Sequence, residues 1–229
     1  AADFEHELDA LQGPSGKALH GLVLDLRSNP GGLLTSAVQI ADDLLDSGKI
    51  VSTRGRIAIS DSQFNATPGD RLHGAPVVAL VDAGSASAAE VLAGALTDNH
   101  RARIVGSRTF GKGSVQTLLP LDNGDSVKLT TARYYTPSGK SIQARGIEPD
   151  VVLHGGKDGA EGARADYAEK LLPGHLHGDM EEAGSHAGER ILAGCRHTRR
   201  ARRRMAGRQG ASAARLAPQR RIVRPSQCR

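Results

Sequence analysis

Two serines in one turn are the first candidates for chemistry in this sequence. Ser85 and Ser87 lie in Gly84-Ser-Ala-Ser87, which separates a short apolar run from a run of small, helix-forming residues. A serine at a strand-to-helix turn is placed to act as a nucleophile, because the free N–H groups and the dipole of the helix favour an alkoxide and an oxyanion. The alternative is that one of these serines only caps the helix.

Lys112 is the candidate base for such a serine. Histidine is the usual base, but none of the five histidines in the first 154 residues lies in a motif-like setting: His6, His20, His73, His100 and His154. Lys112 lies between two glycines, which would let the backbone approach closely and bury the amine. A Ser/Lys dyad needs that amine uncharged, which desolvation in an apolar pocket favours. The alternative is a solvated loop lysine.

Other kinds of site are disfavoured. Gly106-x-x-x-x-Gly111-Lys112 nearly completes a phosphate-binding loop, but residue 113 is Gly rather than Ser or Thr, and a strand-type run follows instead of a helix. No pair of histidines has metal-ligand spacing, and both cysteines, Cys195 and Cys228, lie close to the C-terminus. The sequence therefore predicts no metal and no cofactor.

The elements that must position these residues predict an α/β fold. Strand-type apolar runs alternate with helical periodicity, with strands at 21–26, 76–82 and 103–106 and helices at 33–45 and 88–96. This order favours parallel βαβ units with right-handed crossovers. Further along, Asp122-Asn-Gly-Asp125 predicts a hairpin between antiparallel strands at 115–119 and 127–135. Ile50-Val51 begins another extended segment, which completes the first strand-helix-strand unit of the expected parallel sheet, and we expect 54–74 to be a surface loop.

Charge divides the chain near residue 190. The full chain carries +5, yet all 25 acidic residues lie at or before Glu189, whereas 191–229 holds 12 Arg and no acid, so 1–190 carries −7. We predict a catalytic core at 1–154, a helical or linker extension at 155–190 and a disordered, basic C-terminal tail at 191–229. A frameshifted end of a GC-rich gene would give the same tail composition.

Four sequence blocks together resemble the C-terminal processing peptidases, also called tail-specific proteases. They occur in the family's order between Gly21 and Leu153, and they are Leu24-Asp-Leu-Arg-Ser-Asn-Pro-Gly-Gly32, Gly84-Ser-Ala-Ser-Ala-Ala-Glu90, Gly106-Ser-Arg-Thr-Phe-Gly-Lys-Gly-Ser-Val-Gln116 and Gly146-Ile-Glu-Pro-Asp150. The resemblance implies a ClpP/crotonase-like core and a serine endopeptidase that uses a Ser/Lys dyad to cleave proteins near their C-termini. The site residues it implies are the nucleophile Ser87, the base Lys112, the lysine-orienting Gln116, and the oxyanion-hole amides of Ala88 and of Gly31 or Gly32.

The resemblance also sets expectations for the rest of the protein. In the family a PDZ-like domain precedes the first block, whereas twenty residues precede Gly21 here, so we expect an N-terminally truncated catalytic domain. The implied partners are unfolded or tagged proteins that present a C-terminus. The implied location is the bacterial cell envelope, with a periplasmic or membrane-anchored parent. The start of the chain has no signal-peptide pattern.

Two other functions compete with this interpretation. A non-catalytic ligand-binding module on the same fold is disfavoured by the intact set of Ser87, Lys112 and Gln116. Nucleic-acid binding through the basic run Arg199-Arg-Ala-Arg-Arg-Arg204 is disfavoured because the tail has no aromatic residue for base stacking and the body is acidic.

Overall fold

Two four-stranded sheets form the frame of the protein. The computed structural model describes residues 1–13, 18–56, 60–153 and 167–179. The first sheet is parallel throughout, in the order β1-β4-β5-β8, and consists of β1 (Leu22–Asp25), β4 (Val77–Val81), β5 (Ala102–Gly106) and β8 (Val151–Val152). The second is antiparallel, in the order β3-β2-β7-β6, and consists of β2 (Lys49–Gly55), β3 (Ser62–Asn65), β6 (Ser114–Pro120) and β7 (Ser126–Tyr135).

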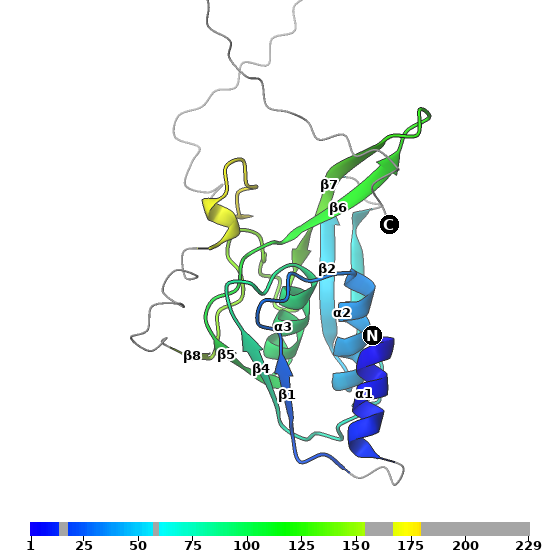
Figure 1. The fold of residues 1–229 in the computed structure, drawn as a ribbon, viewed down its shortest axis with the longest axis vertical. Helices are drawn as coiled ribbons and strands as arrows, with labels where there is room; N and C mark the ends of the chain where they lie inside the picture. Colours follow the sequence, from blue (N-terminus) through cyan, green and yellow to red (C-terminus); the bar gives the residue numbers. More distant parts are fainter. Residues whose placement is uncertain (14–17, 57–59, 154–166, 180–229) are drawn as a thin grey trace, which may run out of the picture.

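Helix α3 (Ala88–Asp98) forms the centre of the core. It contacts β5 of the parallel sheet and β2 of the antiparallel sheet, and α2 (Leu34–Leu44) packs against it (Figure 1). Every residue of α3 from Ala88 to Leu96 is buried. A helix can be buried on all sides in this way because most of its side chains are small, which lets both sheets approach its axis.

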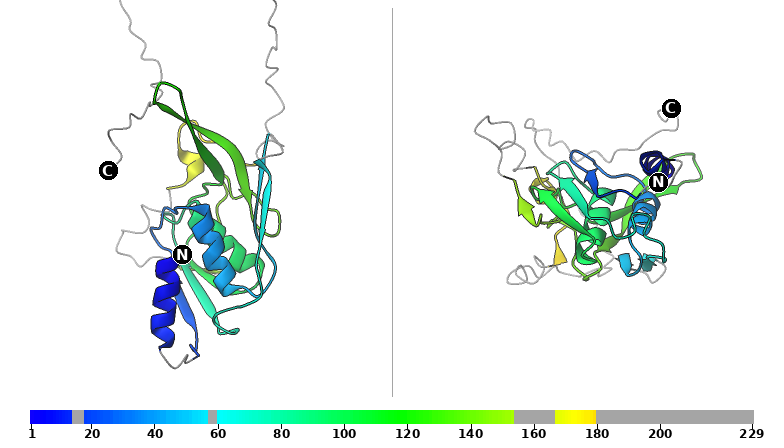
Figure 2. Two further views of the ribbon diagram at one scale, coloured as in Figure 1. Left: turned by 90° about the vertical axis from the view of Figure 1, so that its right-hand side faces the viewer. Right: turned by 90° about the horizontal axis from the view of Figure 1, so that it is seen from below.

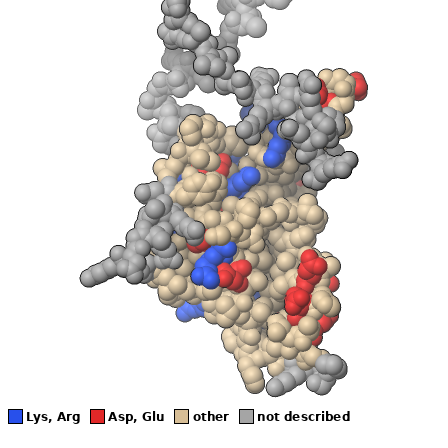
Figure 3. Space-filling model, viewed as in Figure 1, with Lys and Arg blue, Asp and Glu red and all other residues tan. Residues whose placement is uncertain are grey.

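The edges of the frame carry two further features. Helix α1 (Ala2–Gln12) packs near α2 through the buried Leu8, and acidic side chains gather on its exposed surface (Figures 1 and 3). The β6–β7 hairpin projects beyond the body of the molecule (Figure 2). Within the described residues no helix has the length and apolarity needed to cross a membrane.

The predicted α/β class is confirmed, with corrections in three places. Ile50 and Val51 belong to β2, which joins the antiparallel sheet rather than the parallel one. The expected surface loop at 54–74 is wrong over its first part, because β2 extends to Gly55 and β3 pairs with it. Helix α1 was not predicted.

The C-terminal predictions meet the structure only in part. Of the predicted extension at 155–190, the structure describes 167–179, and residues 167–178 form one short 3-10 turn, η2 (Glu169–Leu171), and otherwise irregular chain. Residues 167–178 thus contain no α-helix, and the choice between a helical and a linker extension for the rest of 155–190 stays a prediction. The predicted basic tail at 191–229 lies outside the described residues.

Burial of α3 predicts which leucines stabilise the fold. Leu96 has no exposed surface, so Leu96→Ala should lower the free energy of unfolding by about 2–5 kcal/mol through lost burial and a residual cavity. The matched control is Leu118→Ala in β6, where the side chain is 64% exposed and the loss should stay within about 0.5 kcal/mol. Urea unfolding measures both. Equal losses would contradict a core centred on α3.

Candidate active site

Three loops that carry the candidate residues leave the same edge of the parallel sheet. They follow the carboxyl ends of the neighbouring strands β1, β4 and β5. The first loop contains Gly31 and Gly32, the second ends at Ser87, and the third contains Lys112. Because parallel strands end at one edge, residues far apart in the sequence meet there, and this edge is where open α/β sheets bind ligands.

The structure separates the roles of the two serines. Ser85 is fully buried; its hydroxyl donates to Leu26 O at 2.7 Å and accepts from Asp82 N at 3.0 Å. These bonds tie the turn to the end of β1. Ser87 is half-buried and is the N-cap residue of α3, with φ 56° and ψ −117°. A positive φ is costly for a residue other than glycine, and such strain is concentrated at functional sites.

The first loop packs directly against Ser87. Ala86 N donates to Asn29 O at 2.9 Å. A Cβ added to Gly31, where φ is +89°, would lie 2.7 Å from Ala88 N and 3.0 Å from Ser87 Cβ. Only glycine therefore fits at position 31, and it brings the two predicted oxyanion donors, the Ala88 amide and the glycine turn, together beside Ser87.

The two glycines differ in what their amides contact. Gly31 N donates to the side-chain oxygen of Asn29 at 2.9 Å, so this N–H is already engaged within its own loop. Gly32 follows it and is exposed. If the glycine turn supplies an oxyanion-hole amide, as the resemblance implies, Gly32 is better placed to supply it than Gly31.

Glu90 joins the serine turn to the lysine loop. This side chain has no exposed surface, and its carboxylate accepts four hydrogen bonds. Oε1 accepts from Thr109 Oγ1 at 2.5 Å and Gly111 N at 2.7 Å, and Oε2 accepts from Ser87 N at 2.8 Å and Lys112 N at 2.9 Å. Since both nitrogens bind the same oxygen, they cannot be farther apart than the sum of the two distances. The backbone positions of the candidate nucleophile and the candidate base therefore lie close together.

The electrostatics of Glu90 reflect its burial. Desolvation raises the pKa of the Glu90 carboxyl above its ordinary value, while the four hydrogen bonds favour the charged form and oppose that shift. Sequence reasoning assigned no role to this residue. The pattern Ser87-x-x-Glu90 is a capping box, however, and that signal predicts contact between the Glu90 side chain and the Ser87 amide.

The backbone of the Lys112 loop is held on several sides. Phe110 N donates to Ser85 O at 3.0 Å, Gly111 O accepts from Ala144 N at 2.8 Å, and Gly113 O accepts from Tyr134 N at 2.8 Å. Lys112 is half-buried, and the glycines on either side of it are buried. Burial of its amine in an apolar pocket stays a prediction. The loop continues into β6, so a phosphate-binding loop, which must lead into a helix, is excluded.

Gln116 lies on β6, within the strand predicted at 115–119. It is exposed, pairs with Thr130 of β7 and follows a bulge between Val115 and Gln116. The bulge redirects side chains at the start of the strand. The role of Gln116 in orienting Lys112 stays a prediction.

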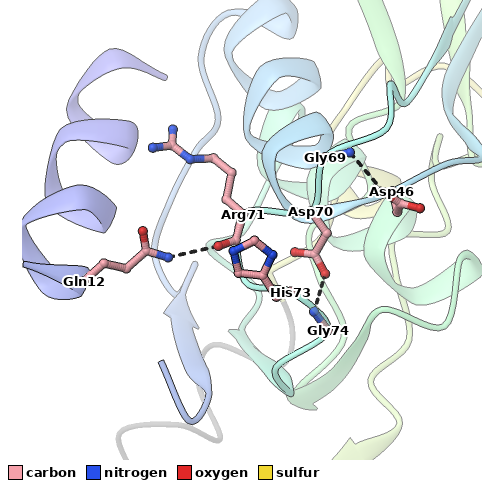
Figure 4. Close-up of a pocket in the computed structure, with 7 residues that line it drawn as sticks. All are labelled: Gln12, Asp46, Gly69, Asp70, Arg71, His73 and Gly74. Carbon is pink, nitrogen blue, oxygen red and sulfur yellow. Dashed lines mark hydrogen bonds between the residues drawn. The ribbon is translucent and has the colours of Figure 1, made fainter. Parts of the chain in front are cut away.

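A pocket lies between α1 and the loop before β4, at the edge of the parallel sheet where β4 begins. Gln12 Nε2 donates to Arg71 O at 2.9 Å, and Asp70 and Asp46 accept from backbone amides of the 69–74 loop (Figure 4). These bonds fix the loop and the end of α1 where β4 begins, whereas Ser87 lies beyond the end of β4.

Within the described ranges no group of three His, Cys, Asp or Glu side chains is arranged to hold a metal ion.

The four bonds to Glu90 predict a large loss of stability when its charge is removed. Glu90→Gln places an NH₂ group against one of the two pairs of donors, so two buried donors lose their acceptor. The free energy of unfolding should fall by about 2–4 kcal/mol. The control is Glu148→Gln, an exposed carboxylate paired with Arg108, where the loss should be below about 1 kcal/mol. Urea unfolding at neutral pH distinguishes the two variants. An unchanged free energy of unfolding in Glu90→Gln would show that the carboxylate does not hold the loops.

The end of β1 predicts a pH dependence. Arg27 donates three hydrogen bonds to Asp25, and this contact lowers the pKa of Asp25 to about 2. Because the folded-state pKa lies below the ordinary value, the contact stabilises the folded chain above that ordinary value and the stabilisation is lost as the pH falls towards about 2. Both side chains are about half exposed, so the effect is small.

The measurement is the difference in unfolding free energy between wild type and Asp25→Asn at several pH values. This difference should shrink as the pH is lowered from about 5 to about 2. Asp122→Asn, at an exposed position in the hairpin turn, serves as the matched control and should show no comparable trend. If the difference for Asp25→Asn does not change with pH, the ion pair does not contribute to the pH dependence of stability.

Comparison with known proteins identifies the family. A model of peptidase family S41 matches residues 1–153. The chain is 49% identical to the carboxy-terminal-processing protease of Bartonella bacilliformis over 164 residues, which are 71% of this chain and 38% of that protein. It is 40% identical over 179 residues to the chloroplastic C-terminal processing peptidase of Tetradesmus obliquus, covering 78% of this chain and 35% of that protein.

A solved structure has the same fold. The photosystem II D1 C-terminal processing protease superposes with a TM-score of 0.60 at 40% identity, covering 67% of this chain and 39% of that one. The chain thus spans less than two fifths of the length of these relatives. Since the family match extends over more than half of its residues, and the named relatives are proteases, the chain belongs to peptidase family S41.

Proposed function

We propose that this chain carries the catalytic core of a serine endopeptidase that cleaves proteins near their C-termini with a Ser/Lys dyad. The observation that carries the proposal is the shared acceptor Glu90 Oε2, which binds the backbone amides of both Ser87 and Lys112. The names of the relatives, which refer to processing of C-termini, support the choice of substrate.

The first half of the reaction forms an acyl-enzyme. The Ser87 hydroxyl oxygen attacks the scissile carbonyl carbon, the uncharged Lys112 amine takes the hydroxyl proton, and the carbonyl electron pair moves to its oxygen. The tetrahedral intermediate then collapses. The C–N bond breaks, and the Lys112 ammonium returns the proton to the leaving amine. Gln116 orients the lysine in this proposal.

The second half uses water. Lys112 takes a proton from a water molecule that attacks the ester carbon, and it returns this proton to Ser87 when the C–O bond to the enzyme breaks. Amides of Ala88 and of Gly32 donate to the oxyanion in both halves. Each such donor contributes about 3 kcal/mol to transition-state stabilisation in other serine hydrolases.

The substrates we propose are unfolded or tagged proteins that present a C-terminus. The matched relatives include bacterial and chloroplast proteases, and we place the longer parent protein in the bacterial cell envelope. A peptide substrate must lie extended across the carboxyl edge of the parallel sheet, because Ser87, the glycine turn and the Lys112 loop all lie there.

Substitution of the dyad tests the proposal. With casein as an unfolded substrate, Ser87→Ala and Lys112→Ala should each lower the cleavage rate at least about 10³-fold, because either change removes the nucleophile or its base. The matched controls are Ser62→Ala on β3 and Lys128→Ala on β7, both at exposed positions, which should cleave at the wild-type rate. Mass spectrometry of the products shows whether the cuts fall near the C-terminus.

A covalent probe gives an independent measurement. A fluorophosphonate should modify Ser87 in the wild type and not in Lys112→Ala, since attack requires removal of the hydroxyl proton. Equal cleavage and equal labelling in all variants would overturn the dyad. Cuts scattered along the substrate would support a serine endopeptidase but contradict C-terminal processing.

A further inference from the structure

The segment 167–179 contacts the Lys112 loop and strand β7 through residues near its two ends. Glu169 N donates to Phe110 O at 2.9 Å, and the rings of Phe110 and Tyr167 lie 5.0 Å apart between centroids. At its other end Asp179 forms an ion pair with Arg133 of β7. This segment lies beyond residues 1–153, the range of the family match. It nevertheless contacts the loop that carries the candidate base and strand β7, which pairs with the strand after that loop.

Gln143 lies between this segment and the loop. Its side chain is 1% exposed. Its oxygen accepts from Gly113 N at 3.1 Å, and its nitrogen donates to Leu176 O at 2.9 Å. One buried carboxamide therefore bridges the residue next to Lys112 and the backbone of the segment 167–179.

The backbone packs closely around this bridge. A Cβ added to Gly113 would lie 2.2 Å from Gln143 N and 2.8 Å from Gln143 Cα. On the other side, a Cβ on Gly178 would lie 2.8 Å from Gln143 O. Three stretches of backbone thus lie in direct contact, and the carboxamide fixes their spacing.

The contact satisfies a group that has no access to water. Glu90 already binds the amides of Gly111 and Lys112, so Gln143 completes the support of the loop by binding the next amide. Without that acceptor the buried Gly113 N–H would be unsatisfied, and the loop would move to find a partner. A displacement of about 1 Å at a catalytic group can cost about 10²-fold in rate.

We propose that Gln143 is a positioning residue for Lys112, held in place by the segment 167–179. The inference rests on the proposed function of Lys112 as the base. It assigns to Gln143 no contact with substrate or with reacting atoms. Its effect is to keep the Lys112 loop at the distance from Ser87 that Glu90 sets.

Two substitutions at one position separate positioning from simple folding. Gln143→Met keeps the length of the side chain but removes the acceptor for Gly113 N. Gln143→Glu keeps an acceptor oxygen for Gly113 N, and in its protonated form, which burial favours, it also donates to Leu176 O. We expect kcat for casein cleavage by the full chain to fall about 10- to 100-fold in the Met variant with KM unchanged, and the Glu variant to recover most of the loss. The matched control, Gln63→Met on β3, is exposed and should behave as wild type.

A measurement that needs no catalysis accompanies the kinetics. Amide hydrogen exchange at Gly113 should be at least about 10-fold faster in Gln143→Met than in wild type, and close to wild type in Gln143→Glu. Thermal unfolding of each variant establishes that the folded state is populated at the assay temperature.

The outcomes distinguish this inference from the proposed function. If Ser87→Ala and Lys112→Ala abolish cleavage but Gln143→Met retains the wild-type kcat, the positioning role is wrong and the dyad stands. If Gly113 exchange is unchanged in a folded Gln143→Met variant, the bridge does not hold the loop. If Ser87→Ala cleaves normally, the proposed function fails, and the exchange data alone then decide whether Gln143 fixes the loop.

Discussion

One buried carboxylate organises the candidate site. Glu90 has no exposed surface and accepts hydrogen bonds from the Ser87 turn on one side and from the Thr109–Lys112 loop on the other. A buried charge is tolerated only when its hydrogen-bonding capacity is filled. The four donors meet that condition only if both loops are in place, so burial of this one group couples the geometry of the two loops.

The same contact supports a strained backbone. Ser87 has a positive φ, a conformation that costs on the order of 1–3 kcal/mol for a residue other than glycine. Its amide is bound by Glu90, its flank is packed against Gly31, and the neighbouring Ser85 is tied to the end of β1. Because these contacts fix the turn from three directions, the strained conformation persists, and the side chain is presented at the start of α3.

Much of the fold follows from local sequence pattern. The buried strands β4 and β5 and the helix α3 are predictable because a parallel strand is apolar along its length and a fully buried helix is built from small residues. Strand β3 was missed for a physical reason. Its residues, Ser-Gln-Phe-Asn, have no alternating pattern and take their conformation from pairing with β2.

The candidate site divides in the same way. Ser87, Lys112 and the glycine turn were predicted from motifs, and the structure brings their loops to one edge of the sheet. The supports were not predicted. Gln143 is a buried polar residue in irregular chain, and its two partners, Gly113 and Leu176, are distant in sequence. No local pattern encodes such a contact, since it exists only after the three segments have packed.

The arrangement of the two sheets sets the relation between nucleophile and base. Ser87 follows β4 of the parallel sheet, whereas Lys112 lies on the connection from β5 into β6 of the antiparallel sheet. Helix α3 lies between the sheets and carries Glu90 in its first turn, so the group that joins the two loops is also part of the core that spaces the sheets. A change in the packing of α3 therefore alters the distance between the loops as well as the stability of the fold. The core and the candidate site are therefore coupled, because Glu90, which links the two loops, is part of α3, which fills the core.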